Sequence, residues 1–449
     1  MSIRFHLYTL RTQNSVSPQC VEMTPNDPSL VGRYSRMATG TTSESVWAYR
    51  FTRLTELLAQ WQWLWAPAPF THRGSPWQPR SDEESQWVTA ISAELAELDD
   101  GDCERLQHEP YRDSPLASWL PVAELQELIG VPATDVADGS FPQRWAQHVS
   151  GRKWQQMVAF VPHVAAPRQG GLVEWCAGKG HLGRLMARCH QQPVVGLEWQ
   201  SALCRDGQQL ADRQQLPVEM VCQDVMQPDV ECWLSSQGGV AALHACGDLH
   251  VRLIELVRQK GTALTLAPCC YQRTQAEYYR PLSSQGQMLS RDLGLGLTRE
   301  HLALAVQETV TASRGERRKR ERGNAWRLGF DELQRELRGS DDYLPVPSLA
   351  YGRMPEQFAD FCRWAGGQKR IEIPGEVDWS HYESRGWQRL RLTNRQELVR
   401  HLFRRPLEIW LVLDRVLWLE EAGFEVELVE FCAAELTPRN LLIKALPRR

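Results

Sequence analysis

The sequence predicts an α/β fold: a parallel, doubly wound sheet that ends in an antiparallel edge hairpin, joined to an N-terminal helical region and a helical insertion. Two observations support this. Five short apolar runs alternate with helical segments over residues 172–267, and two further strands follow a late helix near the C-terminus. Alternation at this spacing is typical of a parallel sheet with helices on both faces. We therefore expect one Rossmann-like domain built from residues 141–301 and 406–449.

The five parallel strands of this domain are predicted from apolar runs of four or five residues, and its helices from apolar residues three and four apart. The strands are expected at residues 172–175, 193–197, 218–222, 240–244 and 264–267, and the helices between them at residues 182–190, 202–214 and 251–260. A late helix is expected over residues 406–422, since Pro406 suits a first turn and Gly423 a stop. Strands at residues 424–431 and 441–445 then form the edge hairpin.

Two other regions lack this alternation. Residues 1–140 are predicted to be mostly helical, with one apolar helix face over residues 49–65 and a second amphipathic run over residues 82–98. A further helical stretch at residues 143–164 precedes the first strand. Residues 302–405 are charged and are interrupted by Gly-Ser and Pro-x-Pro segments. We interpret them as an insertion, because the last two strands need the sheet.

The composition excludes several classes of protein. The chain is 42% hydrophobic and 24% charged, with a net charge of -4, so any nucleic-acid contact requires a local basic patch. No run of about 18 apolar residues is present, and the N-terminus lacks the apolar core of a secretory signal. We therefore expect no membrane association and a cytoplasmic location, where the 12 cysteines stay reduced.

The strongest single signal comes directly after the first predicted strand, in the segment Leu172-Val-Glu-Trp-Cys-Ala-Gly-Lys-Gly-His-Leu182. Gly178 and Gly180 allow the backbone to approach a ligand closely. Glu174 is placed to accept a hydrogen bond from a ligand ammonium group or a bridging water. Many tight turns between a strand and a helix need glycine, so this segment alone does not indicate a cofactor. The residues at the ends of the following strands strengthen the prediction.

Acidic residues follow the next two strands. Glu198 is placed to accept hydrogen bonds from both hydroxyls of a ribose, and Asp224 to receive the amino group of an adenine. The fourth strand leads into His244-Ala-Cys-Gly-Asp248 and the fifth into Pro268-Cys-Cys-Tyr271. Because ligands of open α/β sheets bind beyond the carboxyl ends of the strands, these segments predict one site for an adenosine-containing cofactor.

A nicotinamide dinucleotide is the competing cofactor. Gly178, Gly180 and Gly183 nominally complete the spacing Gly-x-Gly-x-x-Gly that such cofactors favour. The predicted antiparallel hairpin after the fifth strand decides against a nicotinamide dinucleotide, because this ending is typical of methyltransferases.

Four motifs together resemble a methyltransferase-like superfamily: Glu-Trp-Cys-Ala-Gly-Lys-Gly-His-Leu, His-Ala-Cys-Gly-Asp-Leu, Ala-Pro-Cys-Cys-Tyr and Thr-Pro-Arg-Asn-Leu. This superfamily includes the eukaryotic tRNA acceptor-stem 2′-O-methyltransferases and the glutathione-transferase-domain-containing methyltransferase-like proteins. The resemblance covers about residues 150–300 and 406–449. It implies a Rossmann-like class I methyltransferase fold with S-adenosyl-L-methionine as the cofactor.

The resemblance also implies which residues form the site. The implied cofactor-binding residues are Glu174, Ala177, Gly178, Lys179, Gly180, Leu182, Glu198, Asp224, Val225 and Cys246. On the methyl-acceptor side the candidate catalytic residues are Asp248, Cys270 and Tyr271. Asp248 would position the acceptor or take its proton, and Tyr271 would provide a hydrogen-bonding wall.

Cysteines gather at the predicted strand ends, namely Cys176, Cys246, Cys269 and Cys270. Four thiols can make a zinc site, but the Cys-x2–4-Cys pairs of structural zinc are absent. Adjacent Cys269 and Cys270 would point to opposite sides of an extended backbone. We therefore expect buried thiols and no metal, with a metal site or a nucleophilic thiol as the alternative.

One segment of the insertion, residues 314–322, holds six basic and two acidic residues. Such a run commonly forms a solvated helix surface. The functional alternative is an RNA-phosphate patch beside the site, formed by Arg314, Arg317, Arg318, Lys319, Arg320 and Arg322. The sequence thus favours an S-adenosylmethionine-dependent methyltransferase of RNA, with tRNA as a candidate. A methyltransferase of a protein or small molecule and a non-catalytic RNA-binding module remain alternatives, and the oligomeric state is not predicted.

Overall fold

The computed structural model describes residues 45–134, 141–147, 149–167, 169–307, 314–349 and 353–448. The chain divides into two units, Met1–Val46 and Trp47–Arg449, and the elements described below belong to the second, apart from Val46, the first residue of the first helix. The helical character expected for residues 1–44 lies outside the described residues.

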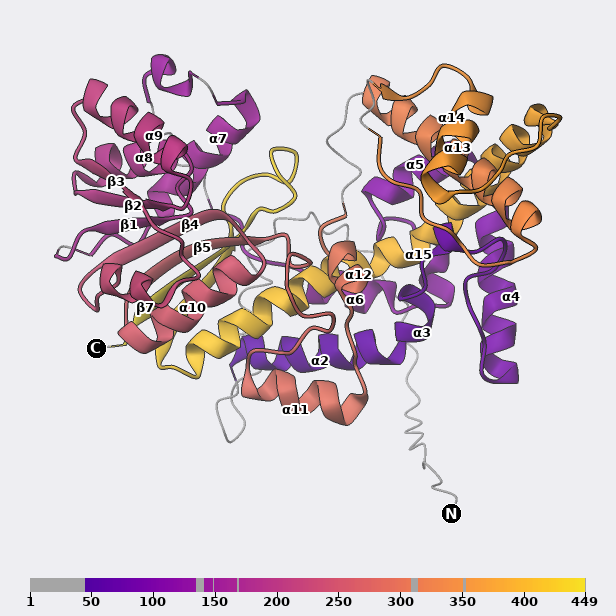
Figure 1. Ribbon diagram of the computed structural model, residues 1–449. Coiled ribbons are helices and arrows are strands. Elements are labelled where there is room, and N and C mark those ends of the chain that lie inside the picture. Colours follow the sequence, from indigo (N-terminus) through magenta and orange to yellow (C-terminus); the bar gives the residue numbers. More distant parts are fainter. Residues whose placement is uncertain are drawn as a thin grey trace, which may run out of the picture. The chain divides into compact units, whose positions relative to one another are not determined.

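A seven-stranded sheet lies at the centre of the α/β part (Figure 1), with the strand order β3-β2-β1-β4-β5-β7-β6. Its strands are β1 (Leu172–Trp175), β2 (Val194–Glu198), β3 (Val218–Cys222), β4 (Gly239–Cys246), β5 (Ala263–Cys269), β6 (Phe424–Glu430) and β7 (Leu441–Pro447). The first five strands are parallel, and β7 is antiparallel to both β5 and β6. This arrangement confirms the predicted fold, including the antiparallel edge.

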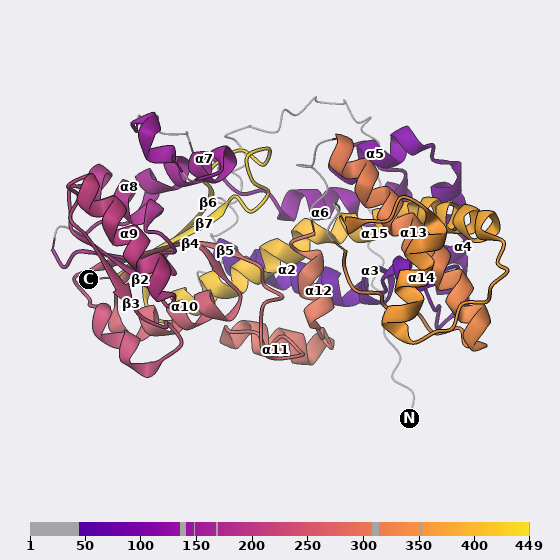
Figure 2. The same cartoon turned by 45° about the horizontal axis from the view of Figure 1, so that its top comes forward.

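Helices cover both faces of this sheet, as Figures 1 and 2 show. One face carries α7 (Gly151–Phe160), α8 (His181–His190) and α9 (Ser201–Arg213), and the other carries α10 (Asp248–Lys260) and the end of α15 (Trp379–Glu420). Every residue of β5 is therefore buried. A strand covered on both faces is a continuous apolar run, which is why the sequence pattern located it.

The described part of the N-terminal region is helical, as predicted. It contains α2 (Val46–Gln60), α3 (Gln62–Trp65), α4 (Asp82–Glu97), α5 (Asp100–His108) and α6 (Val122–Leu128). The apolar face over residues 49–65 is shared by α2 and α3, which are separated at Trp61. The stretch 143–164 is not one helix: the 3-10 turns η3 (Gln143–Ala146) and η4 (Val161–His163) flank α7.

The late helix was predicted to begin at Pro406, and this prediction is wrong. α15 is a single helix of 42 residues from Trp379 to Glu420, with Pro406 inside it and Asp378 capping its first turn. Proline cannot donate the amide hydrogen bond to the carbonyl four residues earlier. That carbonyl, of Leu402, instead accepts a hydrogen bond of 2.8 Å from the Tyr111 hydroxyl. A partner distant in sequence therefore permits a proline that looks like a helix start.

The predicted insertion, residues 302–405, does not end at a break in the backbone, because α15 passes through its C-terminal boundary. The other helices after β5 are α11 (Ser284–Leu293), α12 (Arg299–Leu304), α13 (Arg314–Arg338) and α14 (Phe358–Lys369). Within the ranges given above, no helix has both the length and the apolar character needed to span a bilayer.

Candidate cofactor and acceptor site

The loop between β1 and α8 makes a sharp turn. Cys176, Gly178 and Gly180 all have positive φ angles, of 58°, 60° and 60°. The positive φ angle of Gly180 favours glycine, and a Cβ atom there would lie 2.7 Å from the Met220 sulfur and displace that side chain. A Cβ atom at Gly178 would meet nothing within 4 Å. Gly178 is therefore the place where a ligand can approach this backbone.

Glu174 lies beneath this loop, buried at the end of β1. Its Oε2 atom accepts a hydrogen bond of 2.7 Å from the backbone N–H of Gly183, in the first turn of α8. Burial raises the pKa of Glu174 to about 8. One carboxyl oxygen thus orders the start of α8, a role that the sequence analysis did not assign.

Glu198 connects the end of β2 to the glycine loop. Its Oε2 atom accepts a hydrogen bond of 3.0 Å from the Gly178 N–H, and its Oε1 atom accepts one of 3.0 Å from the Gln200 N–H. Each carboxylate oxygen has two acceptor sites, so each keeps capacity for a ligand hydroxyl. The structure thus brings together Glu198 and Gly178, as the sequence predicted.

The segment after β3 adds Asp224, which is exposed and whose Oδ1 atom accepts a hydrogen bond of 3.0 Å from the Met226 N–H. Val225, between them, is buried. Trp199 and Met226 are exposed by 68% and 41%, and the sequence analysis missed both. The available signal was a tryptophan directly after an acidic strand end, where an exposed indole can stack on a base.

The remaining predicted cofactor residues of the loop stabilise its shape. Ala177 and Leu182 are buried, and the Ala177 N–H donates to the Leu197 carbonyl. The Lys179 Nζ atom lies 2.8 Å from Asp206 Oδ2 on α9. In the described structure these three side chains contact protein, so they hold the loop in position.

On the other side of β1, β4 leads into the predicted acceptor side. Asp248 is the first residue of α10, and its Oδ2 atom accepts a hydrogen bond of 2.8 Å from the Gln275 N–H. The carboxylate therefore ties the start of α10 to the loop after β5. A carboxylate at a helix N-terminus is also stabilised by the helix dipole.

Three thiols meet where β4 and β5 end. The sulfur atoms of Cys246, Cys269 and Cys270 all lie within 4.8 Å of one another. Cys270 has a φ angle of 49°, so the backbone is not extended there and its thiol turns toward that of Cys269. This corrects the expectation that the two thiols point to opposite sides. Hydrogen bonds from the thiols of Cys246 and Cys269 hold the pKa of Cys270 well below its ordinary value.

Tyr271 was predicted to form a hydrogen-bonding wall, and its placement does not fit that role. Its side chain is buried in the core, with its ring centroid 6.0 Å from that of His250 and 4.9 Å from the Arg415 guanidinium carbon. Within the described part of the chain its hydroxyl has no hydrogen-bond partner. The left-handed turn at Cys270 directs the next side chain inward, which a sequence pattern does not reveal.

A buried hydrogen-bond chain supports the end of β4, and the sequence analysis missed it. Arg415 donates from Nε to His250 Nε2 at 2.9 Å, and His250 Nδ1 lies 2.9 Å from the Ala245 carbonyl. Since arginine can only donate, Nε2 accepts and Nδ1 carries the proton. Burial lowers the pKa of His250 to about 3, so this histidine is neutral. The chain fixes the residue directly before Cys246.

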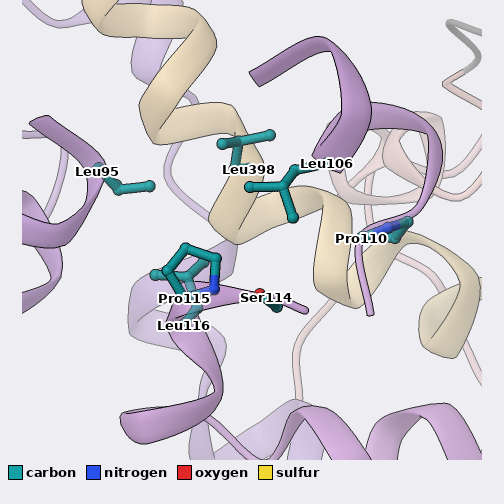
Figure 3. Close-up of a pocket in the computed structure, with 7 residues that line it drawn as sticks. All are labelled: Leu95, Leu106, Pro110, Ser114, Pro115, Leu116 and Leu398. Atoms are coloured by element: carbon teal, nitrogen blue, oxygen red, sulfur yellow. The ribbon is translucent and has the colours of Figure 1, made fainter. Parts of the chain in front are cut away.

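An apolar hollow lies in another part of the molecule (Figure 3). It is lined by Leu95, Leu106, Pro110, Ser114, Pro115, Leu116 and Leu398. It contains about 200 Å³ of empty space but is nowhere wide enough for a water molecule. Because it holds no space for even a water molecule, it is a packing defect between helices.

The predicted basic patch lies on the first turns of α13. Arg318, Lys319 and Arg320 are exposed, whereas Arg317 forms an ion pair with Glu104 on α5 and Arg322 lies over the Trp326 ring at 5.0 Å. The side chain of Arg314 lies outside the described residues. The position of the patch beside the site stays a prediction.

One comparison with known proteins bears on the residues of this site. Residues 152–277 match a family model described as a methyltransferase domain. The chain therefore contains a methyltransferase domain. The matched part runs from α7 to the loop after β5, so it includes every predicted cofactor-binding and catalytic residue. S-adenosylmethionine is the methyl donor of domains with this fold.

A search of curated proteins finds no match. Among solved structures, that of geranyl diphosphate methyltransferase in complex with GPP and sinefungin is 13% identical to this methyltransferase-domain protein, with a TM-score of 0.23. The similarity covers 45% of this chain and 78% of that chain.

Proposed function

We propose that this protein is an S-adenosyl-L-methionine-dependent methyltransferase that acts on RNA, with tRNA as the first candidate. One observation supports the cofactor part of this proposal. Glu198 accepts a hydrogen bond from the Gly178 N–H, where the backbone has free space beside it, and the next residue, Trp199, is exposed. These groups lie at the ends of β1 and β2, within the methyltransferase domain.

Each residue has a defined task in this proposal. Glu198 accepts the ribose hydroxyls, Trp199 and Met226 cover the base, and Asp224 accepts the amino group of the base. The cofactor supplies an electrophilic methyl group. The protein chiefly aligns the acceptor with that methyl group and removes its proton where needed. In this proposal, Asp248 is the carboxylate that takes up the proton.

The RNA half of the proposal depends on charge. Arg318, Lys319 and Arg320 provide exposed positive charge, which favours phosphate contacts. Arg314 follows Gln307 by seven positions, so α13 begins at most about 25 Å from Gln307. The neighbouring Val306 carbonyl accepts a hydrogen bond from Arg439. Besides the hydrogen bonds from Cys246 and Cys269, the positive charge of Arg439 lowers the pKa of the Cys270 thiol. These links support the proposal that a polyanion bound on α13 reaches the acceptor side.

Calorimetric titration with S-adenosylmethionine tests the cofactor half. We expect Glu198→Gln and Trp199→Ala each to weaken binding at least about tenfold, or about 1.4 kcal/mol. Glu219→Gln, a matched change at an exposed residue of β3, should leave the affinity unchanged. A parent protein that binds no cofactor would instead support the non-catalytic alternative.

Transfer of a labelled methyl group from the cofactor tests the RNA half. We expect label in RNA, and modified nucleosides that disappear from cells lacking the protein. The double change Arg318→Glu and Lys319→Glu should raise KM for RNA, reduce the salt dependence of RNA binding and leave cofactor affinity unchanged. Label found only in protein or small molecules would favour those acceptors and contradict the RNA proposal.

A further inference from the structure

The cluster formed by Cys246, Cys269 and Cys270 depends on two irregular backbone features. The pairing of β4 with β5 shifts register between Leu243 and Cys246, which brings Cys246 opposite Cys269. The positive φ angle of Cys270 then adds the third thiol. Residues with side chains rarely adopt that conformation, and its occurrence often marks a functional site.

The spacing of the sulfur atoms suits a shared metal ion. Tetrahedral zinc with Zn–S bonds of about 2.3 Å separates its sulfur ligands by about 3.8 Å. Cys246 and Cys269 have sulfur atoms 3.6 Å apart, and the third sulfur lies within 4.8 Å of both. A set of ligands consisting only of thiols selects soft, thiophilic ions such as zinc.

The surroundings of the cluster support the same interpretation. The Ala245 carbonyl accepts a hydrogen bond from His250 and a weaker one of 3.8 Å from the Cys269 thiol. His250 is itself held by the buried Arg415. Outer hydrogen bonds of this kind orient metal ligands, and here they fix the backbone that presents Cys246.

We propose that Cys246, Cys269 and Cys270 bind one zinc ion through their thiolates, with a fourth position open on the acceptor side. Among the described residues, no fourth cysteine, histidine or carboxylate places a ligand atom in this group. Three protein ligands with one open position are the pattern of a catalytic zinc site. Such an ion binds an oxygen or sulfur atom of the acceptor and lowers its pKa. The metal site stands on geometry alone, whereas this role rests on the proposed function.

The absence of Cys-x2–4-Cys pairs led the sequence analysis to expect no metal. Such pairs mark only those sites whose ligands are close in sequence. Here Cys246 is 23 residues from Cys269, and the pairing of neighbouring strands brings them together.

The metal content of the full-length protein, purified with a phosphine reductant and dialysed against zinc, tests the proposal. We expect about one zinc per chain in the parent and in Cys189→Ala, a control at an exposed cysteine of α8. Cys246→Ala, Cys269→Ala and Cys270→Ala should each bind less than about a tenth of that amount, with unchanged circular dichroism. A parent that binds no zinc, or correctly folded cysteine variants that keep it, would overturn the site.

Spectroscopy on the parent protein keeps the test valid if the variants do not fold. X-ray absorption at the zinc edge should show three sulfur ligands at about 2.3 Å. In cobalt-substituted protein, 2-mercaptoethanol should shift the thiolate-to-cobalt absorption band by entering the open position. Four sulfur ligands in the absence of added thiol, or a band that does not respond, would contradict the open position. Zinc without cofactor binding would leave the site intact and refute the proposed function, and the reverse result would refute the site alone.

Discussion

Two buried glutamates at neighbouring strand ends have different hydrogen-bond partners. Glu198 accepts hydrogen bonds from the loop that faces the ligand side, whereas Glu174 accepts one from the first turn of α8. Burial raises the pKa of Glu174 to about 8, so its carboxyl group is largely protonated at neutral pH. The ionisation of Glu174 is therefore sensitive to any cation that approaches.

This property predicts proton release when the cofactor binds. If the cofactor ammonium group approaches Glu174, the positive charge lowers the carboxyl pKa and expels up to one proton at pH 7. Calorimetry in buffers with different ionisation enthalpies measures that number. Glu174→Gln keeps an acceptor for the Gly183 N–H but has no proton to lose, so its binding should release fewer protons. Equal proton release by the two proteins would show that Glu174 does not face the cofactor.

The buried neutral His250 predicts sensitivity to acid. Its pKa of about 3 in the folded state lies below the ordinary value of 6.5, so the unfolded state binds the proton more readily. Its contribution to stability is therefore complete above pH 6.5 and is lost as the pH falls toward 3. At pH 5 the loss is about 2 kcal/mol.

Denaturant unfolding between pH 7 and pH 5 checks this expectation. His250→Leu should be less stable at pH 7, because leucine cannot accept the hydrogen bond from Arg415. As the pH falls toward 5, the slope of its unfolding free energy against pH should correspond to about one proton less than in the parent. The same pH dependence in both proteins would place a charged histidine in the fold and contradict the structure.

Sequence reasoning located these residues only in part. The positions of Glu198, Gly178 and Asp224 in the fold could be predicted because strand ends and glycine turns have local signatures. Trp199 was missed because the sequence does not show that its side chain is 68% exposed. Tyr271 was misplaced because Cys270, directly before it, has a positive φ angle. Local pattern gives the position of a residue along a strand but not the direction of its side chain at an irregular turn.

The elements of the sheet were predicted well because strands buried on both faces are continuous apolar runs. β1, which is buried at all four positions, begins and ends where the sequence indicated. The bounds of the edge strand β3 also match, although Glu219 and Cys222 are exposed. The start of α15 was predicted wrongly, since a proline inside a helix and a proline at a helix start look alike in sequence. The Tyr111 hydroxyl that satisfies the freed Leu402 carbonyl comes from 291 residues away.

A double-mutant cycle tests this explanation of α15. Tyr111→Phe should destabilise the parent by about 1–3 kcal/mol, because it leaves the Leu402 carbonyl without a donor. In a Pro406→Ala background the backbone N–H that the substitution introduces can bond to that carbonyl, so the same change should cost much less. Thermal unfolding of the four proteins gives the coupling. Additive effects would mean that the hydroxyl does not compensate for the proline.

At the scale of the whole molecule, α15 connects regions that the sequence analysis described separately. Its Arg400 and Trp410 hydrogen-bond to Trp65 and Thr55 in the N-terminal helices, while its last turns contact β6 and α10. Composition and punctuation suggested boundaries at residues 140, 301 and 405. Composition and punctuation could not reveal that α15 packs against the N-terminal region, the predicted insertion and the sheet, because this packing depends on tertiary contacts.

The central claim is that the ends of β1, β2 and β3 together form one adenosyl site. A crystal structure with S-adenosylhomocysteine tests it most directly. We predict ribose hydroxyls within hydrogen-bond distance of Glu198, and the adenine beside Trp199 with its amino group on Asp224. A nucleoside bound elsewhere, or none at saturating concentration, would contradict the account.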